Sequence, residues 1–261
     1  DESRNPEEMG ARLAKVVFQP PSASYRSDPN LIWLATSCDE RIPAFWLESK
    51  GAQHTLLFSH GNAEDLGHIV RYFKEFKTRL GVNIFAYEYS GYGMSTGQPR
   101  EAAVYADIEA AFRYLRDSLR IPWQQIIPYG RSIGTAPSVW LAMRTPVRGL
   151  VLQSPMLSIY RIPFEFRFTL PGDIFTNVSR IDKVRCPVFI IHGTRDEIVP
   201  VWHGQHLYDC CVKSGTAHAP FWVEDADHNN LENMAGEAFL IRFQRFLWHL
   251  ERAPILDQLR E

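Results

Sequence analysis

Ser132 lies in residues 130–134 (GRSIG), directly after an apolar strand-like segment and before a stretch with helical character. In an abrupt turn from strand to helix the central residue is strained, and glycines on either side remove Cβ atoms that would clash. The serine then stands at a helix N-terminus, where free N–H groups and the helix dipole favour developing negative charge. The pattern predicts a nucleophile, although an ordinary turn with an N-cap serine fits the same residues.

Two further residues could activate this serine. Asp196 ends residues 191–196 (IHGTRD) after an apolar run, and His228 follows a later one in residues 224–229 (EDADHN). A serine hydroxyl is a weak nucleophile, so His228 would accept its proton and later return it to the leaving group. Asp196 would orient the imidazole and stabilise its positive form. The chain order Ser, Asp, His is that of α/β-hydrolases and differs from the orders of the two main serine-protease groups.

Other candidates for these roles are weaker. Asp227 is the alternative acid, but a residue directly before the histidine can hardly reach round to its far nitrogen. His60 and His192 also follow apolar runs, and we interpret both as hydrogen-bonded structural residues. No H-E-x-x-H or comparable ligand cluster is present, so we expect no metal ion. The glycines of residues 89–97 (YSGYGMSTG) miss the dinucleotide spacing G-x-G-x-x-G by one position, so we expect no cofactor.

Acyl transfer also requires N–H donors aimed at the oxyanion that develops on the attacked carbonyl. In α/β-hydrolases one donor belongs to the residue after the nucleophile and the other to a loop after an earlier strand. Here those residues are Ile133 and Asn62, the latter following the apolar run 55–58 (TLLF). We therefore expect the backbone N–H groups of Asn62 and Ile133 to form the oxyanion hole.

Strand-like and helical segments alternate along the chain in a way that would position these groups. The expected strands are residues 31–36, 42–48, 55–58, 82–87, 126–127, 149–153, 187–191 and 219–223. The expected helices are about 65–80, 101–119, 132–143, 203–212 and 231–250. This alternation predicts an α/β fold with a mostly parallel, doubly wound sheet and an antiparallel N-terminal hairpin. Functional loops in such sheets lie at the carboxyl ends of the strands, where each candidate residue falls.

The composition of the chain limits which classes of protein it can belong to. The 261 residues include 28 Lys and Arg against 30 Asp and Glu, a formal net charge of −2, so we expect no nucleic-acid partner. With 45% hydrophobic residues the chain can bury a sizeable core, and no repeat or linker divides it. We expect a single domain over residues 1–261. No apolar run reaches the about 18 residues of a membrane-spanning helix.

The cysteines indicate the redox compartment. Cys38, Cys186, Cys210 and Cys211 show no C-x-x-C spacing and form a poor disulfide framework. A reducing compartment such as the cytoplasm fits them best. A glycosylation-type sequon at Asn177 would matter only in a secreted protein.

Residues 159–171 (IYRIPFEFRFTLP) combine dense aromatics with two arginines between two expected strands. They predict a short cap over the nucleophile, within an insertion at about 155–185, although simple packing on the core explains the aromatics equally well. In a cap, Tyr160, Phe164 and Phe168 would be candidates for binding an apolar acyl chain.

Five motifs together resemble the alpha/beta-hydrolase-domain-containing 17 family, within the wider Bem46-like serine hydrolases. They are residues 59–67 (SHGNAEDLG), 89–93 (YSGYG), 105–108 (YADI), 129–135 (YGRSIGT) and 191–194 (IHGT). The resemblance runs from about Lys15 to the last expected helix. Arg131 stands where the family usually has glutamine, and Glu88 replaces a more common aspartate, so the class of enzyme is better indicated than its substrate.

The resemblance implies a serine hydrolase that removes palmitoyl groups from cysteines of membrane-associated proteins. It also implies a cytoplasmic protein held at the membrane face by an acylated, cysteine-rich N-terminal segment, which is not among these residues. Acylated proteins would then be its partners. A lipase, esterase or peptidase of the same fold is the alternative enzyme, and a non-catalytic interaction module that kept the fold is the alternative from another class.

Overall fold

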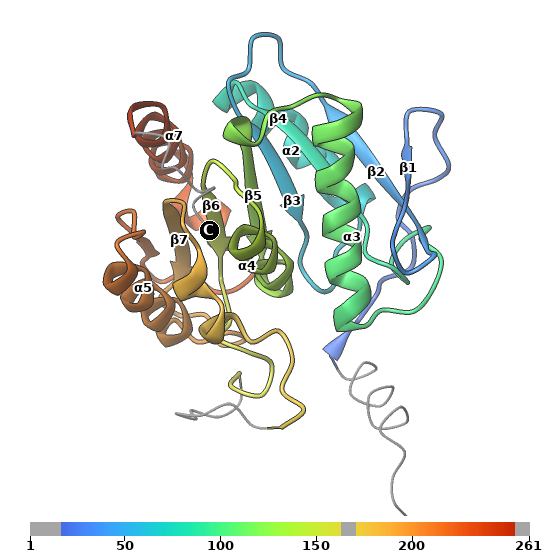
Figure 1. Ribbon diagram of the computed structural model, residues 1–261. Coiled ribbons are helices and arrows are strands. Elements are labelled where there is room, and N and C mark those ends of the chain that lie inside the picture. The colour runs from blue at the N-terminus through green and yellow to red at the C-terminus, as the bar shows by residue number, and fades with distance from the viewer. Residues whose placement is uncertain (1–16, 163–170, 254–261) are drawn as a thin grey trace, which may run out of the picture.

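The computed structural model describes residues 17–162 and 171–253 (Figure 1). Their strands form one eight-stranded sheet in the order β1-β2-β4-β3-β5-β6-β7-β8. The strands are β1 (Ile32–Ala35), β2 (Arg41–Leu47), β3 (Thr55–Ser59), β4 (Asn83–Tyr87), β5 (Ile126–Arg131), β6 (Leu150–Gln153), β7 (Val188–Gly193) and β8 (Phe221–Val223). The β1–β2 and β2–β4 pairs are antiparallel and all others are parallel. The predicted α/β-hydrolase fold with an antiparallel N-terminal hairpin is confirmed.

Helices cover both faces of this sheet (Figure 1). They are α2 (Leu66–Leu80), α3 (Glu101–Arg113), α4 (Thr135–Arg144), α5 (Trp202–Ser214), α6 (Leu231–Ala235) and α7 (Glu237–Arg252). The apolar side chains of α3, α4 and α5 belong to one buried cluster. Those of α2 and α7 belong to a second cluster on the opposite face. The sheet is therefore the middle of three layers.

Helix α2 shows how the sequence sets these elements. Asp65 caps its N-terminus by accepting a hydrogen bond from the His68 N–H, and Gly81 ends it in a left-handed conformation with φ of 66°. Its buried residues recur every three or four positions and face the sheet: Leu66, Ile69, Phe73 and Phe76.

The prediction of one continuous C-terminal helix is wrong. The sequence predicts a helix over about 231–250, but α6 and α7 are separated at Gly236, which has φ of 51°. A positive φ cannot continue a right-handed helix and is accessible to glycine at little cost. The helix is therefore divided at a position that the apolar periodicity alone could not indicate.

The side chain of Asn177 is fully buried. Its amide donates to the Met156 carbonyl at 2.9 Å and to Thr135 Oγ1 at 3.3 Å. The sequon is therefore closed to modification in the folded protein. The four cysteines are free thiols. Within residues 17–162 and 171–253, no helix is long and apolar enough to span a membrane.

Candidate active site

Ser132 lies at the turn from β5 into the short helix η3 (Ser132–Gly134), which leads into α4. Its φ of 53° is unusual for a residue with a side chain. A Cβ on Gly130 would lie 2.2 Å from the Gly134 carbonyl oxygen, and one on Gly134 would lie 2.1 Å from the Ser59 carbonyl oxygen. Both glycines are therefore required sterically, as the sequence pattern predicts.

The structure brings Ser132, His228 and Asp196 into one chain of hydrogen bonds. Ser132 Oγ lies 2.9 Å from His228 Nε2, and His228 Nδ1 lies 2.7 Å from Asp196 Oδ2. The three residues follow β5, β8 and β7, whose parallel alignment brings their carboxyl ends to one edge of the sheet. The loops after β7 and β8 approach closely, since a Cβ on Gly193 would lie 2.4 Å from the Ala226 carbonyl oxygen. This geometry can transfer a proton from the serine to the imidazole.

Asp196 is fixed on both of its oxygens. Oδ1 accepts the N–H groups of Ile198 at 3.0 Å and Val199 at 2.8 Å, and Oδ2 faces His228. Burial alone would raise the pKa of Asp196, but nearby His192, the bond to His228 and these N–H groups outweigh it and hold that pKa well below its usual range. Asp196 therefore stays ionised at neutral pH and can stabilise a positive imidazole.

Asp227, the alternative acid, has a different role. Its Oδ1 accepts the N–H groups of Asn229 at 2.8 Å and Asn230 at 2.9 Å, and its Oδ2 accepts the side-chain amide of Asn230 at 2.8 Å. The carboxylate thus stabilises the turn after His228. It is Asp196 that the structure places on the far imidazole nitrogen.

Asn62 and Ile133 are both near Ser132 in the fold. Ser59, which ends β3, pairs with Gly130 of β5, so the loop carrying Asn62 starts beside the serine turn. Ile133 is the second residue of η3, and the first N–H groups of a helix have no partner within it. The Asn62 side chain is engaged elsewhere: its amide donates to the Val17 carbonyl at 2.7 Å and its Oδ1 accepts the Tyr92 hydroxyl at 2.6 Å. The side chain is thus held toward Val17 and Tyr92, and the proposed oxyanion donor is the backbone N–H of Asn62.

His60 and His192 are completely buried, in keeping with their interpretation as hydrogen-bonded structural residues. One ring nitrogen of His60 lies 2.8 Å from the Gly61 carbonyl oxygen, and the other lies 3.2 Å from Glu88. His192 Nε2 lies 2.7 Å from the Val199 carbonyl oxygen and 3.3 Å from Asp196 Oδ2. The contact between His192 and Asp196 was not predicted, because the sequence pattern indicated only a structural role for His192 and did not pair it with the catalytic acid.

The predicted acyl-binding segment is only partly described. Phe164 and Phe168 lie outside the described residues. Tyr160 is half-buried, and its N–H donates to Asp173 Oδ1 at 3.0 Å. The buried guanidinium of Arg161 lies 3.3 Å from Asp173 Oδ2, which joins the start of this segment to the chain that follows it.

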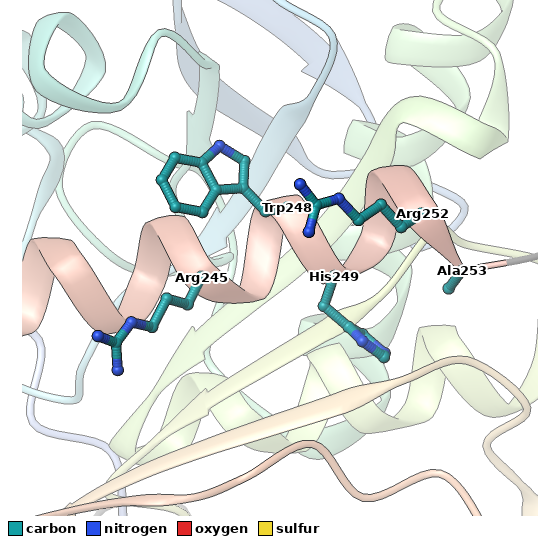
Figure 2. Close-up of a pocket in the computed structure, with 5 residues that line it drawn as sticks. All are labelled: Arg245, Trp248, His249, Arg252 and Ala253. Atoms are coloured by element: carbon teal, nitrogen blue, oxygen red, sulfur yellow. The ribbon is translucent and has the colours of Figure 1, made fainter.

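Among the described residues no cluster of three or more His, Cys, Asp or Glu side chains could hold a metal ion. A shallow hollow of about 420 Å³ lies on the C-terminal half of α7, where Figure 2 shows Arg245, Trp248 and Arg252 spread along the helix. The 16 residues of α7 are about 24 Å long, and none of the residues that line the hollow belongs to the loops of Ser132, Asp196 or His228. This hollow is therefore separate from the Ser132 site.

Comparison with known proteins identifies related chains. The family described as "Serine aminopeptidase, S33" matches residues 50–171. Alpha/beta hydrolase domain-containing protein 17C of Xenopus laevis is 45% identical over 202 residues, which cover 77% of this chain and 63% of that protein. Protein 17B of Homo sapiens is 43% identical over 214 residues, covering 81% of this chain and 73% of that protein. This chain thus spans somewhat under two thirds of the Xenopus relative.

Two solved structures share the fold. An esterase from Pyrococcus furiosus superposes with a TM-score of 0.73 at 19% identity, covering 89% of this chain and 97% of the esterase. Mouse alpha/beta hydrolase domain-containing protein 10 superposes with a TM-score of 0.61 at 19% identity, covering 84% of this chain and 99% of that one. At this identity the likeness concerns the fold alone.

Proposed function

The chain belongs to the alpha/beta hydrolase domain-containing protein 17 family, and we propose that it is a serine hydrolase that cleaves long-chain acyl thioesters through Ser132. The hydrogen-bonded chain from Ser132 through His228 to Asp196 carries this proposal. Its substrates would be S-palmitoylated proteins, which the enzyme would meet at the cytoplasmic face of a membrane.

Each step follows from the positions of these groups. Ser132 Oγ attacks the acyl carbon while His228 Nε2 takes its proton, and the N–H groups of Asn62 and Ile133 bind the oxyanion. Collapse of the tetrahedral intermediate breaks the bond to sulfur, with His228 returning the proton to the thiol. Water then attacks the acyl-enzyme and gives a proton to His228. Collapse of the second intermediate breaks the bond to Ser132 Oγ, which takes that proton from His228 as the fatty acid leaves.

An esterase or peptidase of the same fold is the second candidate, since the matching family carries the description of an aminopeptidase. The leaving group distinguishes them. A thiol has a pKa of about 8.5 and departs with little help from the general acid, whereas an amine leaving group must be protonated.

A fluorophosphonate probe followed by a substrate panel tests the proposal. The wild-type protein should be labelled and Ser132→Ala should not. Wild-type enzyme that has not been treated with the probe should cleave a palmitoyl-cysteine peptide faster than the matching oxyester and far faster than a peptide amide. Absence of labelling in folded wild-type protein would favour a non-catalytic interaction module, and preference for the amide would favour a peptidase.

A further inference from the structure

Arg131 directly precedes Ser132 and ends β5. Its side chain is only 18% exposed and lies on the α2 side of the sheet, where it lines a hollow of about 210 Å³ together with Tyr72 and Tyr129. A partly buried guanidinium needs acceptors for its donors. Those acceptors come from the two loops on either side of the serine.

The first acceptor is Glu64, in the loop between β3 and α2. Its Oε1 receives a hydrogen bond from Arg131 Nη1, and its Oε2 accepts the Gly61 N–H at 2.7 Å. Gly61 immediately precedes Asn62, the proposed oxyanion donor. The same turn has one further closing bond, from the Glu64 N–H to the Gly61 carbonyl, and at 3.4 Å it is long. The Glu64 carboxylate therefore holds the Gly61 N–H, while the Gly61 carbonyl lies 2.8 Å from the His60 ring.

The second set of acceptors belongs to the histidine loop. Arg131 Nη2 donates a long hydrogen bond, of 3.5 Å, to the backbone carbonyl of His228, and Nη1 lies 4.0 Å from Glu232 Oε1 on α6. Glu232 is held in turn by the Gln153 side-chain amide at 2.7 Å, and Gln153 accepts the Tyr129 hydroxyl. One guanidinium thus connects the loop of the oxyanion donor with the loop of the general base.

We propose that Arg131 is a positioning residue that sets the distance of the Asn62 N–H and of His228 from Ser132; this rests on the proposed function. Donors in an oxyanion hole are effective only when they are held in place before the reaction, and a displacement of about 1 Å can cost a hundredfold in rate. Arg131 touches no reacting atom. Its effect is transmitted through Glu64 to the Gly61–Asn62 backbone and through the His228 carbonyl.

Four variants test this role against that of a purely structural ion pair. Arg131→Met keeps the stem without donors, Arg131→Lys keeps the charge, and Glu64→Gln weakens the Arg131 contact while keeping an acceptor for Gly61. Arg79→Met is the matched control, because Arg79 pairs with Glu237 on the same side of the sheet but on the surface. All four are assayed with a p-nitrophenyl ester and an alkylboronic acid, which mimics the tetrahedral intermediate.

Arg131→Met should lower kcat about tenfold or more with KM nearly unchanged, and should weaken boronic acid binding by the same factor as kcat/KM. Arg131→Lys should have a kcat and a boronic acid affinity between those of Arg131→Met and the wild type. The Arg131→Met/Glu64→Gln double variant should be no worse than Arg131→Met alone, because Arg131→Met already removes the contact that Glu64→Gln weakens. Arg79→Met should keep the wild-type kcat. A folded Arg131→Met with wild-type kcat and boronic acid affinity would overturn the proposal.

Chemical rescue gives an independent result. In Arg131→Ala the vacated space adjoins the 210 Å³ hollow, so guanidinium at millimolar concentration should restore part of kcat, whereas urea and sodium chloride should not. Equal responses to all three additives, with folded protein, would contradict the positioning role. If Arg131→Ala does not fold, the kcat values and boronic acid affinities of Arg131→Lys and Arg131→Met decide whether the proposal holds. A wild-type protein that neither hydrolyses the ester nor labels with fluorophosphonate would instead refute the proposed function.

Discussion

Asp196 Oδ2 faces two histidines, with His228 Nδ1 at 2.7 Å and His192 Nε2 at 3.3 Å. Only His228 continues to the serine, while His192 also lies 2.7 Å from the Val199 carbonyl oxygen. The Val199 N–H in turn donates to Asp196 Oδ1. Contacts to both carboxylate oxygens thus restrain Asp196, so the aspartate has little freedom to rotate away from His228.

This arrangement predicts a pH dependence of stability. Burial opposes ionisation of Asp196, yet its contacts with the two histidines and the N–H groups lower its pKa below that of the unfolded chain, about 3.9. The group therefore contributes stability above about pH 4, which is lost as pH falls through the folded pKa. In urea titrations, the difference in unfolding free energy between wild type and Asp196→Asn should shrink steadily below pH 5. A difference that stayed constant down to pH 2.5 would contradict it.

Removing members of the hydrogen-bonded chain should abolish turnover without unfolding the protein. We expect Ser132→Ala and His228→Ala to lower kcat by about 10⁴-fold to 10⁶-fold, leaving oxyanion and binding contributions. Asp196→Asn should be similarly severe. Asp227→Asn should cost far less, because its carboxylate stabilises a turn. Circular dichroism checks the fold of each variant, and a larger loss from Asp227→Asn than from Asp196→Asn at equal stability would reverse the assignment of the acid.

The turn at Ser132 should not tolerate even one methyl group. In Gly134→Ala the new Cβ would lie 2.1 Å from the Ser59 carbonyl oxygen, which is backbone and cannot move without shifting β3. We expect misfolding or loss of fluorophosphonate labelling. Gly215→Ala is the control, since no atom lies within 4 Å of its Cβ position and only its positive φ adds a cost of about 1 kcal/mol. Normal labelling of Gly134→Ala would contradict the steric argument.

Some of the features behind these predictions could be predicted from the sequence, and others could not. Ser132, Asp196 and His228 each follow an apolar strand, and parallel strands bring such positions to one edge, so the pattern predicted both the fold and this cluster. The Arg131–Glu64 link joins residues 67 positions apart, and nothing local distinguishes Glu64 from other surface acids. The break at Gly236 was missed because buried apolar residues continue past it at helical spacing.

Two substitutions at Asn62 should separate the structural role of its side chain from the role of its backbone N–H as an oxyanion donor. Asn62→Ala loses the bonds to Val17 and Tyr92, so we expect a loss of about 1–3 kcal/mol in unfolding free energy with a modest effect on kcat. Asn62→Pro also removes the N–H, which could cost about 3 kcal/mol of transition-state stabilisation. Tyr92→Phe serves as the control for the side-chain contact. Equal, small effects of Ala and Pro on kcat/KM would reject Asn62 as an oxyanion donor.

The dependence on acyl chain length tests the substrate class. Because a thiolate leaves with little help from His228, a thioesterase can use its binding energy on the acyl chain, at about 0.8 kcal/mol for each CH₂ buried. If the segment containing Tyr160, Phe164 and Phe168 supplies the apolar surface, kcat/KM on acyl-cysteine peptides should rise steeply from butyryl to palmitoyl. Phe164→Ala or Phe168→Ala should flatten that rise and leave butyryl turnover nearly intact. Since the Arg161–Asp173 ion pair joins the start of this segment to the chain that follows it, Asp173→Asn should also weaken long-chain turnover selectively. A preference for acetyl or butyryl groups in the wild-type enzyme would exclude the palmitoyl substrate and leave a short-chain esterase.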